Sequence, residues 1–284
     1  MTVPQTVGVL GGGRMGAGIA HAFLLDGARV QLVERDSPSA DAARERVLAS
    51  ITTSVKRGDL ADATAATASL TVGLDVAAFA DARLVVEAVP EDRGLKIDAL
   101  TRIEAVLAAD GVLASNTSSI SIDALAASLT RPERFLGLHF FNPVPASRLV
   151  ELVVGARTDD AVVVDARDWI AALGKTPVVV RDSPGFASSR LGVMLGLEAI
   201  RMLEEGVAEA ADIDAAMELG YRHPMGPLRT TDVVGLDVRL GIAEELAREL
   251  GARFEPPALL RRLVAEGKLG RKSGEGFYVW NEER

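Results

Sequence analysis

Short apolar runs alternate with helical periodicity over the first two thirds of this 284-residue chain. The runs that predict buried strands span residues 7–10, 29–34, 84–89, 112–115, 135–141, 149–154 and 177–181. Helical repeats lie between most of them, at 15–25, 38–57, 96–107, 122–129 and 161–173. Strands that alternate with helices in this way predict an α/β fold with a doubly wound, mostly parallel sheet.

The pattern changes at the run DSPG, residues 182–185. Beyond it we find only helical patterns, at 187–205, 211–219, 231–250 and 257–266, before the closing GEGFYVW. We therefore predict one domain over residues 1–183 and an all-helical C-terminal domain over residues 184–284. The connection from residue 38 to 84 is too long for one helix, so we expect an inserted helical pair within the first domain.

A glycine-rich turn, GGGRMG, follows the first predicted strand and opens the first helix. In a dinucleotide-binding turn Gly11 makes the tight bend, Gly13 lets a pyrophosphate approach the backbone, and Gly16 lets the helix pack closely. The strand–turn–helix context makes this match more specific than the glycines alone. It predicts that residues 1–183 form a Rossmann-like dinucleotide-binding domain.

The second predicted strand ends in an acid, Glu34. Its carboxylate would accept hydrogen bonds from the adenosine ribose hydroxyls and repel a 2′-phosphate, which favours NAD over NADP. Arg35, directly after it, is the residue type that suits a 2′-phosphate, so the preference for NAD depends on Glu34.

Charge and composition narrow the classes of function. A net charge of −9 and a pI near 5.0 argue against a nucleic-acid-binding surface. The chain has no cysteine, which excludes disulfides and thiolate chemistry, and its three histidines form no metal-binding motif, so we predict no metal site. We find no signal peptide and no membrane-spanning run, and interpret the protein as soluble and cytoplasmic.

His139 is the histidine best placed for chemistry. It lies at the end of the predicted strand FLGLHFF, before the irregular turn that contains Asn142, and Glu151 follows in the next apolar run. The alternative for a histidine beside phenylalanines is a half-buried core residue. A nearby carboxylate would favour the imidazolium that forms when a histidine takes a proton. We assign no chemistry to His21, in the first helix, or to His223, in a loop.

Polar residues follow several of the predicted strands. They are the run 116–119, His139 with Asn142, Glu151, and Glu91 with Lys96. Because α/β cofactor sites form where strand ends meet, these residues predict one site at one edge of the sheet.

The runs GGGRMGAGIA, VVEAVPE, SNTSS, GLHFFNPVP, PGF, PMGP, DVVGLD and GRKSGEGFY together resemble those of the L-3-hydroxyacyl-CoA dehydrogenases. The similarity is to the short 3-hydroxybutyryl-CoA dehydrogenases in particular, and it extends in order over nearly the whole chain. It implies an NAD-dependent oxidation of (S)-3-hydroxyacyl-CoA to 3-oxoacyl-CoA in fatty acid metabolism. It also implies a homodimer whose helical domain serves dimerisation and substrate binding.

The resemblance assigns roles to individual residues. His139 corresponds to the base that takes the proton of the 3-hydroxyl, Glu151 to its partner carboxylate, and Ser118 to a contact of substrate and nicotinamide. The predicted cofactor contacts are Gly11, Gly13, Met15, Gly16, Glu34, Glu91, Lys96, Ser118, Asn142 and Lys272. The predicted coenzyme A contacts are Ser50, Lys56 and Arg57, for which an ordinary exposed helix residue is the alternative.

One position departs from the family pattern. Members usually have an asparagine directly before the arginine that follows PGF, whereas here the run is PGFASSR and Ser189 takes that place. Serine is shorter and has a single donor, so Ser189 would contact the substrate oxygen differently. Two other functions therefore stay open. One is a dehydrogenase of a free hydroxy acid, of the L-gulonate type, and the other is a non-catalytic NAD-binding protein like some lens crystallins.

Overall fold

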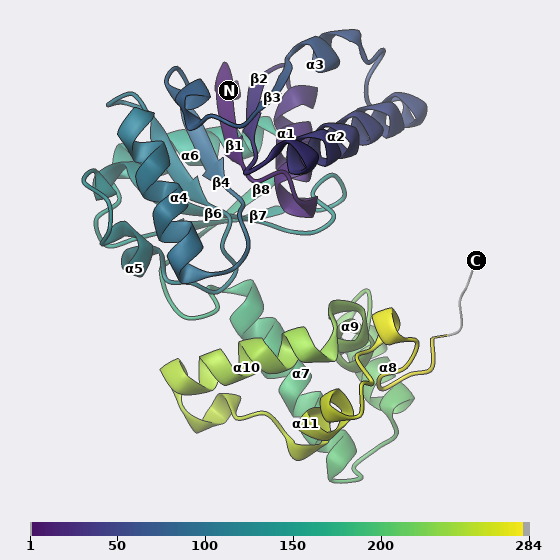
Figure 1. The fold of residues 1–284 in the computed structure, drawn as a ribbon. Helices are drawn as coiled ribbons and strands as arrows, with labels where there is room; N and C mark the ends of the chain where they lie inside the picture. Colours follow the sequence, from purple (N-terminus) through teal and green to yellow (C-terminus); the bar gives the residue numbers. More distant parts are fainter. Residues whose placement is uncertain (1, 281–284) are drawn as a thin grey trace. The chain divides into compact units, whose positions relative to one another are not determined.

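A single eight-stranded sheet forms the centre of the first part of the molecule (Figure 1). The computed structural model describes residues 2–280, which divide into two compact units between Ser183 and Pro184. The order of the strands in the sheet is β3-β2-β1-β4-β5-β6-β7-β8. Their bounds are β1 Thr6–Leu10, β2 Arg29–Val33, β3 Leu70–Gly73, β4 Leu84–Glu87, β5 Val112–Ser115, β6 Phe135–Phe140, β7 Leu149–Val154 and β8 Thr176–Arg181.

All neighbouring strands are parallel except β6 and β7, which pair antiparallel. A loop joins these two strands directly, without the helical crossover that a parallel pair requires. The predicted doubly wound, mostly parallel sheet is therefore confirmed. The antiparallel pair also places the start of β7 at the edge where the parallel strands end, so side chains from both can meet there.

Helices cover both faces of the sheet. One face packs against α1 (Arg14–Leu25), α2 (Ser37–Arg57) and α6 (Asp160–Ala172). The other packs against α4 (Arg93–Val106) and α5 (Ile122–Ala126), and Figure 1 shows α4 in front of the sheet and α6 behind it. Because helices cover both faces of the sheet, β1, β4, β5 and β6 are buried throughout, and this explains their mostly apolar sequences.

Both helices of the predicted pair after β2 are present, the long helix α2 and the short helix α3 (Thr64–Ala68). The prediction missed the edge strand β3, into which α3 leads. Only four residues form this strand, one turn after an alanine-rich segment, so its apolar alternation is too short to separate it from a helix. The strand extends the sheet beyond β2.

The second unit is built from helices, as predicted. They are α7 (Ser188–Glu204), α8 (Ala210–Tyr221), α9 (Pro227–Val234), α10 (Leu236–Leu250) and α11 (Ala258–Ala265). The single helix predicted over 231–250 is in fact two helices, α9 and α10. Gly235 separates them at φ 105°, a conformation open to glycine but not compatible with a continuous helix.

The buried carboxylate of Asp232 binds the end of the described chain to the core of this unit. Asp232 lies on α9 and is fully buried. It accepts hydrogen bonds from the backbone N–H groups of Phe277 and Tyr278, at 2.9 Å each, and from Trp280 Nε1 at 2.7 Å. Three donors satisfy a charge that would otherwise be expensive to bury, so the helices and the GEGFYVW segment form one structure.

His21 lies buried between α1 and α2, where its Nε2 is 3.0 Å from Ser54 Oγ. Burial lowers the pKa of His21 below 6.5; the charge of Asp59 opposes this, and that of Lys175 adds to it. The folded state therefore binds a proton at His21 less readily than the unfolded state does. As a result, neutral His21 costs no stability above pH 6.5, and the free energy of unfolding declines as the pH falls below this value. The interpretation of His21 as a residue without chemistry agrees with this packing.

We expect the free energy of unfolding to fall by up to about 1.4 kcal/mol through His21 between pH 7.5 and 5.5. The measurement is urea unfolding of the wild type and of His21→Gln at both pH values. The free energy of unfolding should change less between the two pH values in His21→Gln than in the wild type. Equal slopes would show that His21 does not titrate differently in the two states.

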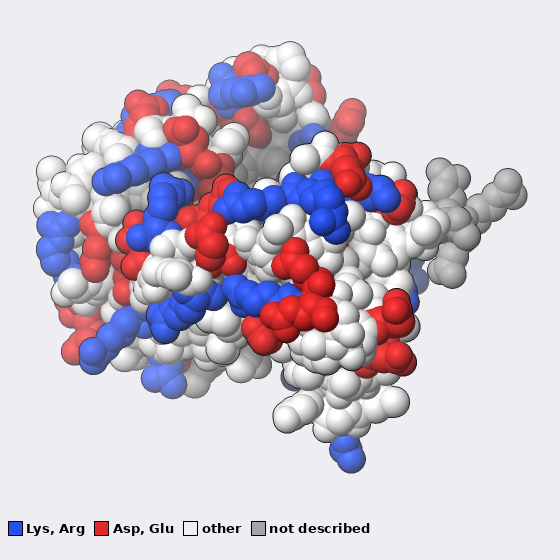
Figure 2. Space-filling model, turned by 90° about the horizontal axis from the view of Figure 1, so that it is seen from below, with Lys and Arg blue, Asp and Glu red and all other residues white. Residues whose placement is uncertain are grey.

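Charges of both signs are mixed on the surface. On the face that Figure 2 shows, lysine and arginine side chains alternate with aspartate and glutamate. Among the ion pairs of the described residues, Lys268 Nζ lies 2.7 Å from Glu275 Oε1. None of the helices within residues 2–280 is both long and apolar enough to cross a membrane.

Candidate active site

The glycine turn is built so tightly that a Cβ at Gly11, Gly12 or Gly16 would clash with neighbouring atoms. Gly11 has φ 95°, and a Cβ there would lie 2.8 Å from Ala88 O. A Cβ on Gly16 would lie 1.8 Å from Gly11 O, because the first turn of α1 packs onto the bend. A Cβ on Gly13 would meet nothing within 4 Å. The backbone at Gly13 therefore faces open space at the N-terminus of a helix, where a phosphate group can approach.

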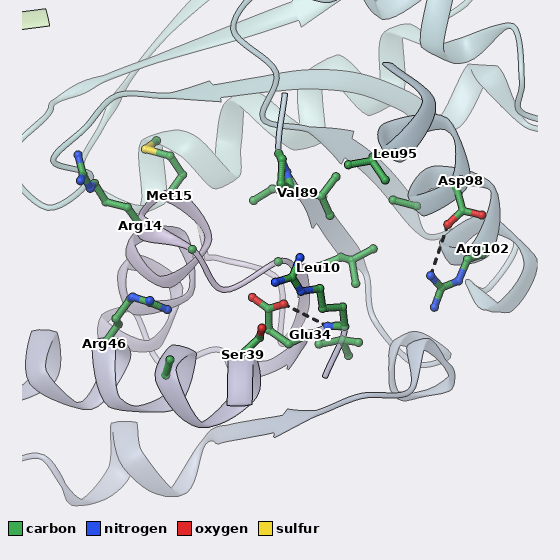
Figure 3. Close-up of a pocket in the computed structure, with 18 of the residues that line it drawn as sticks. Leu10, Arg14, Met15, Glu34, Ser39, Arg46, Val89, Leu95, Asp98 and Arg102 are labelled. Atoms are coloured by element: carbon green, nitrogen blue, oxygen red, sulfur yellow. Dashed lines mark hydrogen bonds and ion pairs between the residues drawn. The ribbon is translucent and has the colours of Figure 1, made fainter. Parts of the chain in front are cut away.

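A cavity of about 750 Å³ opens beside this turn (Figure 3). Glu34 points into it and accepts hydrogen bonds from Gly12 N at 2.7 Å and Arg35 N at 3.1 Å. Arg46, on α2, donates to Gly12 O at 3.1 Å, so it holds the turn from the other side. Four arginines line the cavity, namely Arg14, Arg35, Arg46 and Arg102. A cavity of this size with a helix N-terminus and an excess of arginine fits the adenosine and pyrophosphate of a dinucleotide.

His139 and Glu151 face each other across the antiparallel pair β6–β7. They are direct partners in the register, and His139 Nδ1 lies 2.8 Å from Glu151 Oε2. Both are buried, with exposed fractions of 7% and 1%. The ring of Phe141 packs on the imidazole at 4.4 Å between centroids. A carboxylate bound to Nδ1–H orients the ring, selects the tautomer and stabilises the imidazolium, which is the arrangement of a general base.

The loop after β5 is held by one carboxylate, that of Glu91. Its Oε1 accepts hydrogen bonds from Thr117 Oγ1 at 2.6 Å, Ser118 N at 2.9 Å and Ser119 N at 3.1 Å. Its Oε2 lies 3.3 Å from Lys96 Nζ. The loop that carries Ser118 is thus fixed to the loop after β4.

Burial alone would raise the pKa of Glu91. The charge of Lys96 and the hydrogen bonds from Thr117, Ser118 and Ser119 outweigh this effect, so the pKa lies below its usual range. Glu91 is therefore ionised at neutral pH, and its negative charge keeps the serine loop in place.

Comparison with known proteins agrees with this geometry. The family model described as 3-hydroxyacyl-CoA dehydrogenase, NAD binding domain, matches residues 6–183, and the C-terminal domain of the same family matches residues 185–280. The chain belongs to the 3-hydroxyacyl-CoA dehydrogenase family. The resemblance inferred from its sequence motifs is confirmed, and with it the prediction of an NAD-dependent dehydrogenase.

Three relatives match this chain over almost their entire lengths. The 3-hydroxybutyryl-CoA dehydrogenase of Mycobacterium tuberculosis is 42% identical over 281 residues, which cover 97% of this chain and 98% of the relative. The crystal structure of (S)-3-hydroxybutyryl-CoA dehydrogenase from Ralstonia eutropha is 38% identical with a TM-score of 0.94, covering 98% and 100%. A more distant structure, 30% identical with a TM-score of 0.85 over 98% and 99%, is of a diketoreductase.

The first unit contains most of the predicted site residues, and four of them line the cavity. Gly11, Gly13, Met15 and Glu34 line the cavity. Asn142 lies in the exposed loop directly after β6. Lys96 is only 1% exposed, and its Nζ is held by Glu87, Glu91 and Val89 O, so its contact with a cofactor stays a prediction.

The remaining predicted residues lie elsewhere in the chain. Ser50, Lys56 and Arg57 are on the second half of α2, where Ser50 Oγ donates to Arg46 O at 3.0 Å. Ser189 lies in the first turn of α7, and Lys272 lies 2.6 Å from Asp237 Oδ1, both in the second unit. Their contacts with substrate and cofactor stay predictions.

Sequence reasoning missed Glu87 as a site residue. It ends β4 fully buried, and it accepts hydrogen bonds from Lys96 Nζ at 2.8 Å, Val89 N at 2.7 Å and Ser115 Oγ at 2.6 Å. The signal was present, because a glutamate inside the apolar run LVVEAV needs a buried partner.

Asn116 was recognised only as part of a run. Its Oδ1 accepts a hydrogen bond from Phe140 N at 2.9 Å, next to His139, and so ties the serine loop to β6. No sequence pattern indicates a contact between two loops of this kind.

Proposed function

We propose that the protein oxidises (S)-3-hydroxyacyl-CoA to 3-oxoacyl-CoA with NAD, that its preferred substrates are short, and that 3-hydroxybutyryl-CoA is among them. The observation that carries this proposal is the buried His139–Glu151 pair in a member of the 3-hydroxyacyl-CoA dehydrogenase family. The relatives named for 3-hydroxybutyryl-CoA at 38–42% identity support the short chain length.

In this mechanism His139 Nε2 takes the proton of the substrate's 3-hydroxyl while Glu151 stabilises the imidazolium that forms. NAD, when bound at the glycine turn, supplies the acceptor for the hydride that leaves C3. Ser118 orients the substrate, held in place by the hydrogen bonds of its loop to Glu91. General-base catalysis of this kind contributes about 10² to 10⁴ in rate. Burial of the pair excludes water from the proton transfer.

The decisive experiment is NADH oxidation with 3-oxoacyl-CoA substrates of increasing chain length. Acetoacetyl-CoA should support turnover, and NADPH should be at least about tenfold less effective because Glu34 repels its 2′-phosphate. If no acyl-CoA supports NADH oxidation and a free hydroxy acid reduces NAD, the alternative of a free-acid dehydrogenase is correct. The relative described as a diketoreductase keeps this alternative worth testing.

A non-catalytic NAD-binding protein is the other alternative. It gives no reason for a buried histidine and glutamate in hydrogen-bond contact, since an unreactive pair could be replaced by apolar residues without loss. Absence of turnover with every substrate, together with tight NAD binding, would favour it.

Substitution of Ser189 tests whether this position of the substrate site works as the asparagine usual in the family does. We predict that Ser189→Asn keeps kcat/KM for acetoacetyl-CoA within about tenfold, or roughly 1.4 kcal/mol, because asparagine restores the donor usual at this position. Steady-state kinetics of the variant measure it, with Ser188→Asn as the neighbouring control. Complete inactivation would show that the site is built around serine.

We also propose that residues 184–284 mediate a homodimer. Large apolar side chains of this unit are exposed, including Leu191 at 70%, Leu219 at 83% and Tyr221 at 75%. Exposed apolar surface of this kind is typical of subunit interfaces. Light scattering on the purified protein should give twice the mass of the chain, and a monomer mass across the micromolar range would refute the dimer.

A further inference from the structure

The segment 141–148 connects the two strands that carry His139 and Glu151. It is a compact turn in which Pro143 O accepts hydrogen bonds from Ala146 N at 3.1 Å and Ser147 N at 3.0 Å. The register pairs Phe140 with Val150 next to this segment, and His139 with Glu151 one step further in. The geometry of the His139–Glu151 pair therefore depends on how rigidly the segment 141–148 holds the ends of the two strands together.

A lysine from a different part of the chain binds the segment 141–148 and holds it in place. Lys175 Nζ donates to Val144 O and to Ser147 O, both at 2.6 Å. Two backbone carbonyls of one turn thus converge on a single ammonium group, much as they would around a bound cation. Charge-assisted hydrogen bonds of this length are stronger than those between neutral groups.

The fold delivers Lys175 to this point from the end of α6. Gly174 has φ 67° and ends the helix, and Thr176 N then donates to Arg148 O at 2.6 Å as β8 begins. Burial lowers the pKa of Lys175, and the charge of Asp26 at the end of α1 opposes this. The ammonium is thus held by the loop and lies near enough to Asp26 for the two charges to interact.

The loop also contacts the helix that begins at the glycine turn. Val144 is buried, and a Cβ on Gly18 of α1 would lie 3.0 Å from it. Holding Val144 O consequently sets the position of the loop against α1 as well as the closure of the strand pair.

We propose that Lys175 is a positioning residue for catalysis, which acts through the segment 141–148 to keep His139 aligned with Glu151. The inference rests on the proposed role of His139. Lys175 itself has no part in the proton or hydride transfer. Displacement of a catalytic group by about 1 Å can lower the rate by about 10²-fold.

The test compares Lys175→Met with Lys175→Arg, and with Lys268→Met as a control for loss of a lysine on the other unit. In K175M we expect kcat with acetoacetyl-CoA and NADH to fall about 10- to 100-fold, and the Kd for NADH to stay within about threefold. The deuterium isotope effect on kcat with 4-deuterated NADH should rise, because misalignment slows hydride transfer itself. K175R should recover kcat to within about threefold, and K268M should match the wild type.

Amide hydrogen exchange measures the mobility of the segment 141–148 and does not depend on catalytic activity. In K175M the amides of Ala146 and Ser147 should exchange faster than in the wild type, whereas those of α1 should not. If the wild type lacks activity with every acyl-CoA, the proposed function fails, and the exchange measurement still decides whether Lys175 holds the loop.

The proposal is overturned if K175M keeps kcat and its isotope effect within about twofold of the wild type, or if the amides of Ala146 and Ser147 exchange at unchanged rates. It is also overturned if kcat falls while the isotope effect stays constant, which would indicate only a smaller folded fraction. If K175M does not fold, K175Q, whose amide retains a donor, takes its place in all these measurements.

Discussion

Replacing His139 by glutamine should lower kcat for acetoacetyl-CoA reduction by about 10² to 10⁴-fold and leave the Kd for NADH within about threefold of the wild type. Glutamine is similar in size and can still donate to Glu151, which lies 2.8 Å from His139 Nδ1, but it cannot transfer a proton. The cavity at the glycine turn is lined by other residues, so dinucleotide binding should persist. Steady-state kinetics and NADH fluorescence titration measure the two quantities.

His223→Gln is the matched control, because His223 lies in a loop of the second unit and has no role in the mechanism. It should keep wild-type kcat. Unchanged turnover in H139Q would refute the mechanism, and a parallel loss of NADH binding would mean that His139 supports the cofactor site rather than proton transfer.

Replacing Lys96 by methionine should reduce the free energy of unfolding by about 3–5 kcal/mol. Lys96 and Glu87 are both buried, at 1% and 0% exposure, with Nζ and Oε1 2.8 Å apart. Methionine fills a similar volume and removes the positive charge, which leaves the carboxylate of Glu87 buried without its main counter-charge. Glu91 loses the same partner, so the loop of Ser118 should loosen too. Urea unfolding followed by circular dichroism measures the change.

Two comparisons separate charge from packing in this experiment. The double variant Glu87→Gln/Lys96→Met removes both charges and should recover much of the loss, since a neutral pair needs no counter-charge. Arg102→Met, which removes a cation from the exposed pair with Asp98, should change stability by less than about 1 kcal/mol. A loss below about 1 kcal/mol in K96M would contradict the prediction that Glu87 depends on Lys96 as its counter-charge.

The pairing of His139 with Glu151 could be predicted from the sequence because each residue lies near the end of a strongly apolar strand, and strand ends gather at one edge of a sheet. Patterns of apolar residues do not predict an element when the element is short. Strand β3 has only four residues, so propensity does not distinguish it from the helix before it. The break at Gly235 interrupts a repeat that is helical on both sides, and nothing but its φ of 105° separates α9 from α10.

Contacts between side chains and distant loops were less accessible to sequence reasoning. The resemblance assigned Lys96 and Glu91 to the cofactor, but it does not reveal that Lys96 pairs with Glu87 or that Glu91 binds three residues of the serine loop. Lys175 follows a helix in an ordinary helix-to-strand turn, and its two carbonyl partners lie about thirty positions earlier. Such pairs depend on how the loops fold back, and periodicity carries no information about that.

The hydrogen bonds of Asp232 set the order in which the second unit can be completed during synthesis. Its partners Phe277, Tyr278 and Trp280 leave the ribosome more than forty residues after Asp232 does. Until they arrive, α9 carries a carboxylate that cannot be buried without a large penalty. The nucleotide-binding unit can therefore fold while the chain is still growing, but the helical unit must wait for residues 277–280. A chain that stalls before this segment would have a folded first unit and an incomplete second unit.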